Sequence, residues 1–364
     1  MSREPLQAVA MRHVAGTEAD NSGKAVPAAD GPCSGPQPLS LQYARRMPWW
    51  RRIWTAWRHG LVSVRYTRTG QYIQQLVSHG RDPWPQSSPA RIFQAIMSIR
   101  SEDRYHSKQG RSTCRIGLGD TVSPGPAVAP RAVFLKRFHR AACWRRLLAL
   151  LSSSSAKTPA CHEWKHLLWA KRAGITVPEP LACGEQSGPG LSVSGFLMVA
   201  ALDEHTPVHE ALPLYYAGWP SQEFVRWKRR VIAAMARIVQ RLHRCRRFHR
   251  DLYLCHFFVP NRTTWHAQDV ALIDLHRLTY RSWCTARART KDLAQLLFSS
   301  YLPGVTCMDR WRFLYQYLYP ERLKQHRRLI RAIVRKAGIY EAKAVRRRAR
   351  NKAVLGKETP QSME

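Results

Sequence analysis

Two polar clusters inside apolar segments constrain this chain more than any other feature of its sequence. Residues 248–259 read FHRDLYLCHFFV, and residues 271–278 read ALIDLHRL. Apolar segments that pack into a core do not carry carboxylates without partners, because burying an uncompensated charge costs free energy. Asp251 and Asp274 are therefore either satisfied core residues or part of a site that handles charged groups such as phosphate.

Two further polar residues precede these clusters on expected secondary structure. The segment 131–140 (RAVFLKRFHR) alternates as a strand and carries Lys136, and residues 161–173, closed by Gly174, are expected to form a helix that carries Glu163. A strand lysine, a helix glutamate, an HRD loop and a strand-end aspartate follow one another in this order in protein-kinase-like folds. We therefore expect an α+β, bilobal protein-kinase-like fold with a β-rich N-lobe and a helical C-lobe.

Each of these residues has an ordinary structural explanation when it is considered alone. A lysine at a strand edge, a glutamate on a helix surface, a buried histidine in a loop and an aspartate at a turn are all common. The combination favours a site, because HRD is followed by His256 and then by Asp274 at workable spacing and on suitable elements. In such a site a carboxylate accepts a proton from the attacking hydroxyl, and a second carboxylate helps to hold Mg²⁺ on the phosphates.

The sequence departs from ordinary protein kinases at three points. The glycine-rich GxGxxG loop is absent, and residues 105–117 offer only Gly110 and Gly117. His256 stands where the catalytic loop has asparagine, and Asp274-Leu275-His276 replaces the DFG triplet. These departures argue against an ordinary eukaryotic-type protein kinase.

Three motifs of the C-terminal half resemble the lipopolysaccharide core kinase family, which includes the heptose kinases of the RfaP/WaaP type and the Kdo kinases of Gram-negative bacteria. That family typically shows HRDxYxxHF, IDLHR and KDLxxLxFS, and this chain has HRDLYLCHF, IDLHR and KDLAQLLFS in the same order. The upstream segments VFLKRF and TPACHEWKHLLWAKRAGITVPEPLACGE match more loosely. The resemblance covers roughly residues 103–320.

The resemblance implies ATP-dependent phosphorylation of a heptose or Kdo hydroxyl in the lipid A-linked inner core of lipopolysaccharide. Carried over by position, Lys136 would bind the ATP phosphates, Glu163 would orient Lys136, and Asp251 would be the catalytic base. Gly110 would lie in the nucleotide-binding loop.

The resemblance also implies a metal site and a bracing residue. Asp274 and His256 would hold Mg²⁺. Mg²⁺ prefers oxygen ligands, so His256 ranks below Asp274 as a ligand and has the alternative of orienting Asp251 or a phosphate. Asp292, on the following helix, is expected to brace the catalytic loop.

The composition indicates how the chain is divided. Residues 1–45 are predicted to be a disordered extension, and 46–100 an amphipathic, basic segment in which residues 47–60 place tryptophans and arginines on opposite sides of a helix. This helix suits either a membrane interface or docking onto the main domain. The kinase-like domain is expected at 101–335, with an N-lobe at 101–205 and a C-lobe at 206–335, followed by a basic tail at 336–364.

The net charge and the cysteine content limit which partners and which cellular compartment are expected. The formal net charge of +35 favours polyanionic partners, and an anionic membrane surface is expected beside ATP and the lipopolysaccharide acceptor. No zinc-finger spacing or RNA-recognition motif is present, so no nucleic acid is expected. Nine scattered cysteines, the lack of a secretory signal and the lack of a membrane-spanning run predict a cytoplasmic protein, peripheral at the inner face of the inner membrane.

Three alternatives remain open at this stage. The same fold could act on another envelope glycan, a small molecule or a protein hydroxyl, because acceptor specificity lies in loops. The missing glycine-rich loop leaves an ATP-binding pseudokinase open, although retention of Lys136, Glu163, Asp251 and Asp274 together argues against it. The basic tail leaves some room for a nucleic-acid-binding protein.

Overall fold

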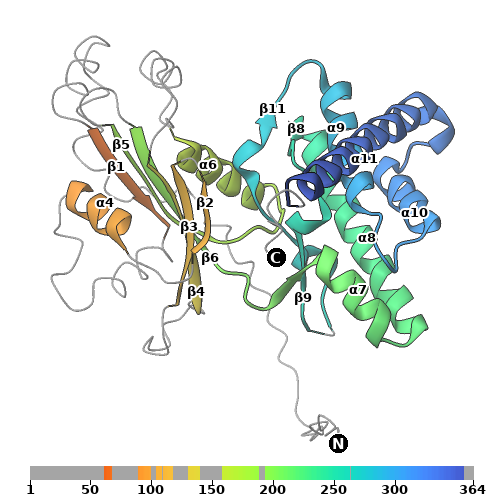
Figure 1. The fold of residues 1–364 in the computed structure, drawn as a ribbon, viewed down its shortest axis with the longest axis horizontal. Helices are drawn as coiled ribbons and strands as arrows, with labels where there is room; N and C mark the ends of the chain where they lie inside the picture. Colours follow the sequence, from red (N-terminus) through yellow and green to blue (C-terminus); the bar gives the residue numbers. More distant parts are fainter. Residues whose placement is uncertain are drawn as a thin grey trace, which may run out of the picture. The chain divides into compact units, whose positions relative to one another are not determined.

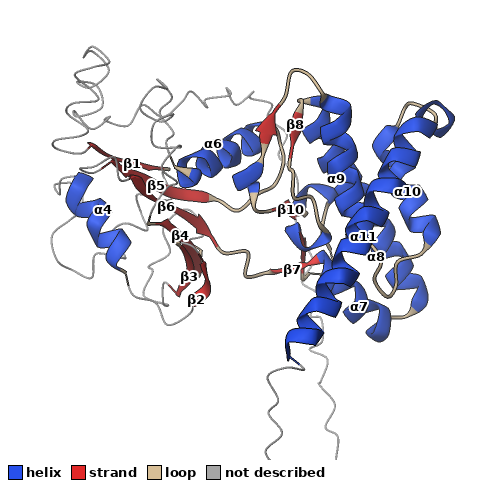
Figure 2. Cartoon of the chain, turned by 45° about the horizontal axis from the view of Figure 1, so that its top comes forward, coloured by secondary structure: helices blue, strands red, loops and turns tan. Residues whose placement is uncertain are grey.

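The computed structural model describes residues 61–67, 89–99, 104–108, 110–117, 130–139, 158–187, 193–262 and 264–355, all within the compact unit Pro38–Glu364. The predicted disordered extension, the tryptophan–arginine helix at 47–60 and the end of the basic tail lie outside the described residues. The first half of the unit is built around a sheet and the second half is mainly helical, as Figures 1 and 2 show.

The N-lobe is a six-stranded antiparallel sheet in the order β1-β5-β6-β4-β3-β2. Gly110, at a φ of 76°, forms the tight turn between β2 and β3, as its position in the sequence predicts. The elements of this lobe are β1 (Leu61–Tyr66), α4 (Pro89–Ser98), β2 (Arg104–Lys108), β3 (Arg111–Gly117), β4 (Ala132–Phe138), α6 (Pro159–Arg172), β5 (Pro180–Ser187) and β6 (Val193–Ala200).

Helices α4 and α6 cover opposite faces of this sheet. Side chains alternate between the two faces of a strand, and on β6 Phe196 packs in the cluster that contains α4, whereas Leu197 packs in the cluster that contains α6. On β4, Phe134 and Phe138 belong to the α6 side. Lys136 shares their parity, so the strand presents its lysine to the face that α6 covers.

Local sequence signals fix the ends of α6. Thr158 is the N-cap, its hydroxyl accepts a hydrogen bond from the amide of Cys161, and Pro159 occupies the first turn. Glu185 of β5 accepts hydrogen bonds from both the amide and the hydroxyl of Thr158, which ties the start of the helix to the sheet. Gly174, at a φ of 64°, follows the helix end as the sequence predicts.

The C-lobe packs helices around an apolar core beside the sheet (Figure 1). The most amphipathic of them, α8, buries Phe224, Trp227, Val231, Met235, Ile238 and Leu242, the face that its helical spacing predicts. The elements of this lobe are β7 (His205–Pro207), α7 (Val208–Gly218), α8 (Ser221–Arg244), β8 (Arg247–Phe248), β9 (Phe257–Pro260), β10 (Ala271–Leu272), β11 (Thr279–Tyr280), α9 (Thr285–Ser299), α10 (Cys307–Leu318) and α11 (Arg327–Leu355).

The bilobal α+β architecture is the one expected from the sequence, and two details extend it. Strand β1 pairs with β5 and α4 packs on the same sheet, so the N-lobe includes residues that precede the expected start at 101. Helix α11 continues without a break from 327 to 355, across the expected boundary at 335, and buries Ile333 and Ala337. Within the described residues, no helix is both long and apolar enough to cross a membrane.

Candidate active site

Lys136 and Glu163 form a close ion pair between the sheet and α6. The Nζ atom of Lys136 lies 2.5 Å from Oε1 of Glu163, whose side chain is almost fully buried, and 3.8 Å from Oδ1 of Asp274. The second oxygen of Glu163, Oε2, is buried and has no hydrogen-bond partner among the described residues. Lys136 therefore stands between two carboxylates that come from different parts of the chain, and its ammonium has a fixed position at the boundary of the lobes.

Asp274 takes an unusual backbone conformation immediately after β10. Its φ of 61° lies in the left-handed region, which few residues other than glycine adopt without support. The support comes from histidines on both sides: His249 Nε2 donates to the carbonyl of Ile273 at 3.1 Å, and His166 Nδ1 donates to the carbonyl of Leu275 at 2.9 Å. The peptide group before Asp274 is thus held from the catalytic loop, and the peptide group after Leu275 is held from α6.

The carboxylate of Asp274 is surrounded by positive and donor groups. His276 Nδ1 lies 2.6 Å from Oδ1, and His256 Nε2 lies 3.8 Å from Oδ2. Burial by itself raises the pKa of Asp274, but the hydrogen bond from His276 and the charge of Lys136 outweigh it and hold the pKa well below its usual range. Asp274 is therefore an anion throughout the neutral pH range.

His256 has one ring nitrogen committed and one available. Its Nδ1 lies 2.7 Å from the backbone carbonyl of Asp251. A carbonyl oxygen can only accept, so Nδ1 carries the proton and Nε2, which faces Asp274, keeps its lone pair when the ring is neutral. The ring of His256 therefore holds the catalytic loop through Nδ1 and presents Nε2, a potential metal ligand, beside the carboxylate of Asp274.

Asp251 lies on the catalytic loop with its carboxylate partly exposed. Both of its oxygens accept hydrogen bonds from NH1 of Arg277, at 3.0 and 2.7 Å. Arg277 belongs to the same IDLHR segment as Asp274, so this segment contributes one residue beside Lys136 and another beside Asp251. Arg277 was not among the residues predicted from the sequence, although its place within the IDLHR motif was the available signal.

The backbone of the catalytic loop is held by Asp292 of α9. Arg250 has a φ of 69°, and the fully buried Asp292 accepts hydrogen bonds from the amides of His249 and Arg250 at 2.7 and 2.8 Å. His243 Nε2 adds a third contact to the same carboxylate at 3.3 Å. The bracing role expected for Asp292 is confirmed.

Two further residues of α9 hold the same loop. Neither was among the residues predicted from the sequence. Gln295 Oε1 accepts from the amide of Leu252 at 3.2 Å, and Ser299 Oγ accepts from the amide of Leu254 at 3.0 Å. Together with Asp292 they occupy one stripe of the helix at i, i+3 and i+7, which places them on a common face. Polar residues at helical spacing within an otherwise apolar segment were the signal that would have identified them.

The structure brings five of the predicted residues together and leaves one apart. Lys136, Glu163, Asp274, His256 and Asp251 are linked by the contacts described above. Gly110 lies in the exposed turn between β2 and β3, where its carbonyl accepts from the amide of His139. Within the described residues, no hydrogen bond or ion pair connects Gly110 to the other five, and its predicted part in nucleotide binding stays a prediction.

The side chains around Asp274 fit a Mg²⁺ site. Within the described ranges, no group of three or more His, Cys, Asp or Glu side chains is arranged to hold a metal ion. Mg²⁺ does not require such a group, because it commonly binds one or two carboxylates together with substrate phosphates and water. The ionised Asp274, with a histidine nitrogen beside it and Lys136 nearby, fits that kind of site.

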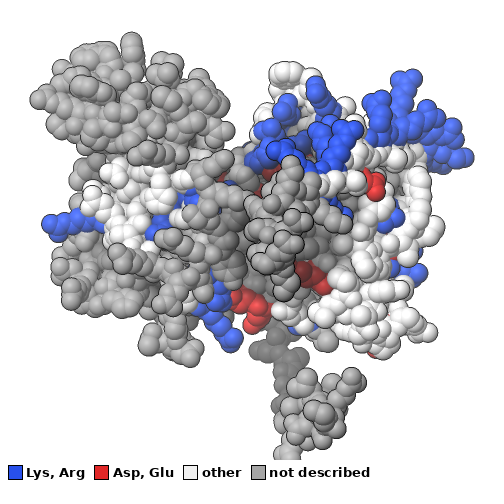
Figure 3. Space-filling model, in the orientation of Figure 1, with Lys and Arg blue, Asp and Glu red and all other residues white. Residues whose placement is uncertain are grey.

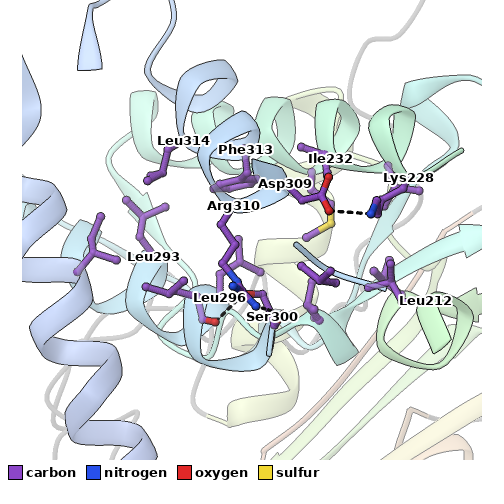
Figure 4. Close-up of a pocket in the computed structure, with 17 residues that line it drawn as sticks. Leu212, Lys228, Ile232, Leu293, Leu296, Ser300, Asp309, Arg310, Phe313 and Leu314 are labelled. Atoms are coloured by element: carbon purple, nitrogen blue, oxygen red, sulfur yellow. Dashed lines mark hydrogen bonds and ion pairs between the residues drawn. The ribbon is translucent and has the colours of Figure 1, made fainter. Parts of the chain in front are cut away.

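An apolar cavity in the C-lobe is separate from this cluster. It has a volume of about 100 Å³ and lies among α7, α8, α9, α10 and α11, with the ion pair of Lys228 and Asp309 at its edge (Figure 4). None of the predicted site residues lines it. The polar cluster between the lobes, and not this cavity, has the groups that phosphate chemistry requires.

The fold and the side-chain arrangement define a protein-kinase-like phosphotransferase. A family model described as lipopolysaccharide kinase (Kdo/WaaP) matches residues 123–317. The chain is 30% identical over 273 residues to the lipopolysaccharide core heptose(I) kinase WaaP of Pseudomonas aeruginosa, covering 73% of this chain and 92% of that protein. It is 31% identical over 275 residues to the enzyme of the same name from Escherichia coli, covering 74% and 94% respectively.

A solved structure shares the fold. The structure described as WaaP in complex with acyl carrier protein aligns with a TM-score of 0.53 and 24% sequence identity, covering 76% of this chain and 98% of that one. This chain belongs to the lipopolysaccharide kinase (Kdo/WaaP) family.

Proposed function

We propose that this protein uses ATP to phosphorylate a heptose hydroxyl in the inner core of lipopolysaccharide. The observation that carries the proposal is the cluster in which Lys136 contacts both Glu163 and Asp274 while Asp251 lies on the adjoining loop. The curated relatives from P. aeruginosa and E. coli are both named as heptose(I) kinases, which favours heptose over Kdo as the acceptor sugar.

Each side chain of the cluster has a role in this proposal. Lys136, held by Glu163, neutralises charge on the ATP phosphates. Asp251 accepts the proton of the attacking sugar hydroxyl, and the bidentate contact with Arg277 fixes its carboxylate in one orientation. Most of the rate enhancement then comes from positioning and from electrostatic stabilisation of the transferred phosphoryl group.

Asp274 and His256 are the residues that would hold Mg²⁺. A magnesium ion held there would supply positive charge that offsets the negative charge developing during phosphoryl transfer. The low pKa of Asp274 keeps its carboxylate ready to ligate, and the proton on Nδ1 of His256 leaves Nε2 free to do so.

We place the reaction at the cytoplasmic face of the inner membrane, because the acceptor is lipid-anchored and ATP is intracellular. The net charge of +35 supports attraction to an anionic surface and to a polyanionic glycan. The predicted division into an N-lobe and a C-lobe is part of the same proposal, with β1 and α4 added to the N-lobe and the whole of α11 added to the C-lobe.

The deciding experiment is phosphate transfer from radiolabelled ATP with Mg²⁺ to dephosphorylated lipopolysaccharide core. Asp251→Asn should lower kcat about 10²- to 10⁴-fold, the usual contribution of a general base, and should leave ATP binding nearly unchanged. Asp269→Asn is the matched control, because Asp269 also pairs with an arginine, Arg262, and within the described residues it forms no hydrogen bond or ion pair with a member of the cluster.

The outcomes separate the alternatives. Label in the core sugar that is lost in Asp251→Asn supports the proposal. Label on another glycan, a small molecule or the protein itself would move the function to that acceptor. ATP binding without transfer to any acceptor would make the chain a pseudokinase.

A further inference from the structure

A second, polar cavity is lined by Phe248, the residue directly before His249, and by none of the predicted site residues. It has a volume of about 310 Å³ and is formed by the end of α8, the β8 and β11 region, the start of α9 and the end of α10. Three arginines, Arg244, Arg246 and Arg289, are among the residues that line it. His243, Tyr317 and Glu321 also contribute to the lining. We call this cavity the arginine pocket.

The three arginines are not neutralised within the described part of the chain. None of the ion pairs between described residues involves them. Arg244 and Arg246 each donate to one backbone carbonyl, of Tyr319 at 3.4 Å and of Ser282 at 3.2 Å. A guanidinium has five N–H donors, so most of their donors and their full charges are available to a ligand.

The lining residues include a single carboxylate, that of Glu321, which lies beside His326 outside the pocket lining. The pocket therefore carries three positive charges against one negative charge. Figure 3 shows Lys and Arg gathered over the region where Figure 1 draws β11 and the start of α9. An anion is the class of ligand that this charge balance favours.

The wall of the pocket is organised in advance by a chain of hydrogen bonds. Arg289 Nε donates to Tyr317 Oη at 2.6 Å, and the Tyr317 hydroxyl lies 2.7 Å from His243 Nδ1. His243 Nε2 in turn contacts Asp292, the residue that holds the catalytic loop. Burial raises the pKa of Tyr317 to about 12 and lowers the pKa of His243, so both are neutral and the network keeps one arrangement. Donors fixed in this way bind a ligand with less loss of conformational freedom.

We propose that the arginine pocket binds a small phosphorylated anion at a site separate from the ATP site. Planar guanidinium groups match phosphate oxygens in pairs, which lysine cannot do. The cavity volume lies at the lower end of the range for ligand pockets, about 300–1,000 Å³, which suits free phosphate or one phosphorylated sugar. This inference does not depend on the proposed sugar-kinase activity, because it concerns binding alone.

The test is isothermal titration of the full chain with inorganic phosphate, with glucose 6-phosphate and with glucose. The double variant Arg244→Gln/Arg246→Gln should weaken binding of the two phosphorylated probes about tenfold or more, because charge-assisted hydrogen bonds are lost. Arg229→Gln on the exposed side of α8 removes the same kind of charge elsewhere and should bind like the parent protein. Lys136→Met disrupts the candidate ATP site and should also leave phosphate binding unchanged.

Several results would overturn the proposal. The first is that neither phosphorylated probe binds saturably. The second is that Arg229→Gln weakens phosphate binding as much as the double variant does. The third is that only Lys136→Met loses phosphate binding, which would place the phosphate in the ATP site. Binding of glucose 6-phosphate well above phosphate, with no binding of glucose, would support the pocket and identify a phosphorylated sugar as the source. Equal binding of both phosphorylated probes would support it with free phosphate as the source.

One further variant guards against a folding artefact. Arg244 and Arg246 are exposed, and circular dichroism of the double variant should show a native fold. Arg289→Lys keeps the positive charge but loses the planar fork, and it should also weaken phosphate binding. If phosphate binding is unchanged both in Arg289→Lys and in the double variant, none of the three arginines binds phosphate and the proposal is wrong.

Discussion

The Nζ atom of Lys136 lies 2.5 Å from Oε1 of Glu163 and thereby joins strand β4 to helix α6. The same helix carries His166, one turn further on, which holds the peptide group after Leu275 through the carbonyl of Leu275. Helix α6 thus positions Lys136 and the segment that carries Asp274 at once. A displacement of this helix would disturb both groups together.

The first prediction concerns the ion pair itself. Lys136→Met should lower kcat/KM for ATP about 10²- to 10³-fold, the usual effect of removing one preorganised electrostatic contact from an active site. Lys171→Met is the matched control, because it breaks another lysine–glutamate pair of the same lobe, with Glu179, that is exposed to solvent. Steady-state kinetics at varied ATP measures both. A comparable loss in the two variants would refute a specific role for Lys136.

The second prediction concerns the brace of the catalytic loop. Asp292→Ala should lower the free energy of unfolding by at least about 2 kcal/mol, because each buried amide left without an acceptor costs about 1–3 kcal/mol. The amides concerned are those of His249 and Arg250. Urea denaturation measures the change. Asp203→Ala breaks a partly exposed ion pair with Arg115 and should cost only about 0–1 kcal/mol. Equal effects of the two substitutions would show that Asp292 is not a brace.

The third prediction concerns the metal site. His256→Gln should raise the Mg²⁺ concentration needed for half-maximal phosphate transfer about 10- to 100-fold, the usual cost of losing a group that ligates or orients a metal ligand. His266→Gln, at a histidine whose side chain is 83% exposed, is the control. A Mg²⁺ titration at fixed ATP provides the measurement. If the Mg²⁺ requirement is unchanged while kcat falls, His256 acts only by orienting Asp251.

The fourth prediction concerns stability against pH. Burial lowers the pKa of His166, His243 and His249 in the folded protein, whereas the unfolded chain titrates near 6.5. As the pH falls below about 6.5, the unfolded state therefore binds protons that the folded state does not, and stability decreases; above that pH these groups contribute no slope. The urea midpoint should be lower at pH 5.5 than at pH 7.5.

A histidine variant assigns part of that effect. His249→Gln removes one titrating group, so the decrease in stability between pH 7.5 and pH 5.5 should be smaller than in the parent protein, even if the variant is less stable overall. His209→Gln, at a partly exposed histidine, is the control. A midpoint that rises on acidification, or a larger decrease in His249→Gln, would contradict the assignment.

The sequence by itself determined the order of the elements and the identity of most of the cluster. The alternation of residues 131–140 placed Lys136 on a strand, the pattern of residues 161–173 placed Glu163 on a helix, and the HRD and IDLHR segments pointed to Asp251 and Asp274. These signals are local, because each depends on residues only a few positions apart along the chain. The family resemblance rests on the same short segments.

The tertiary structure decided which distant groups meet. Several contacts join residues that are far apart in sequence. Strand β1 pairs with β5, Arg277 donates hydrogen bonds to Asp251, and Gln295 and Ser299 accept hydrogen bonds from the catalytic loop. The arginine pocket also combines residues from α8, α9 and α10. No local pattern encodes such contacts, because they depend on how the helices and the sheet pack once their apolar faces are buried.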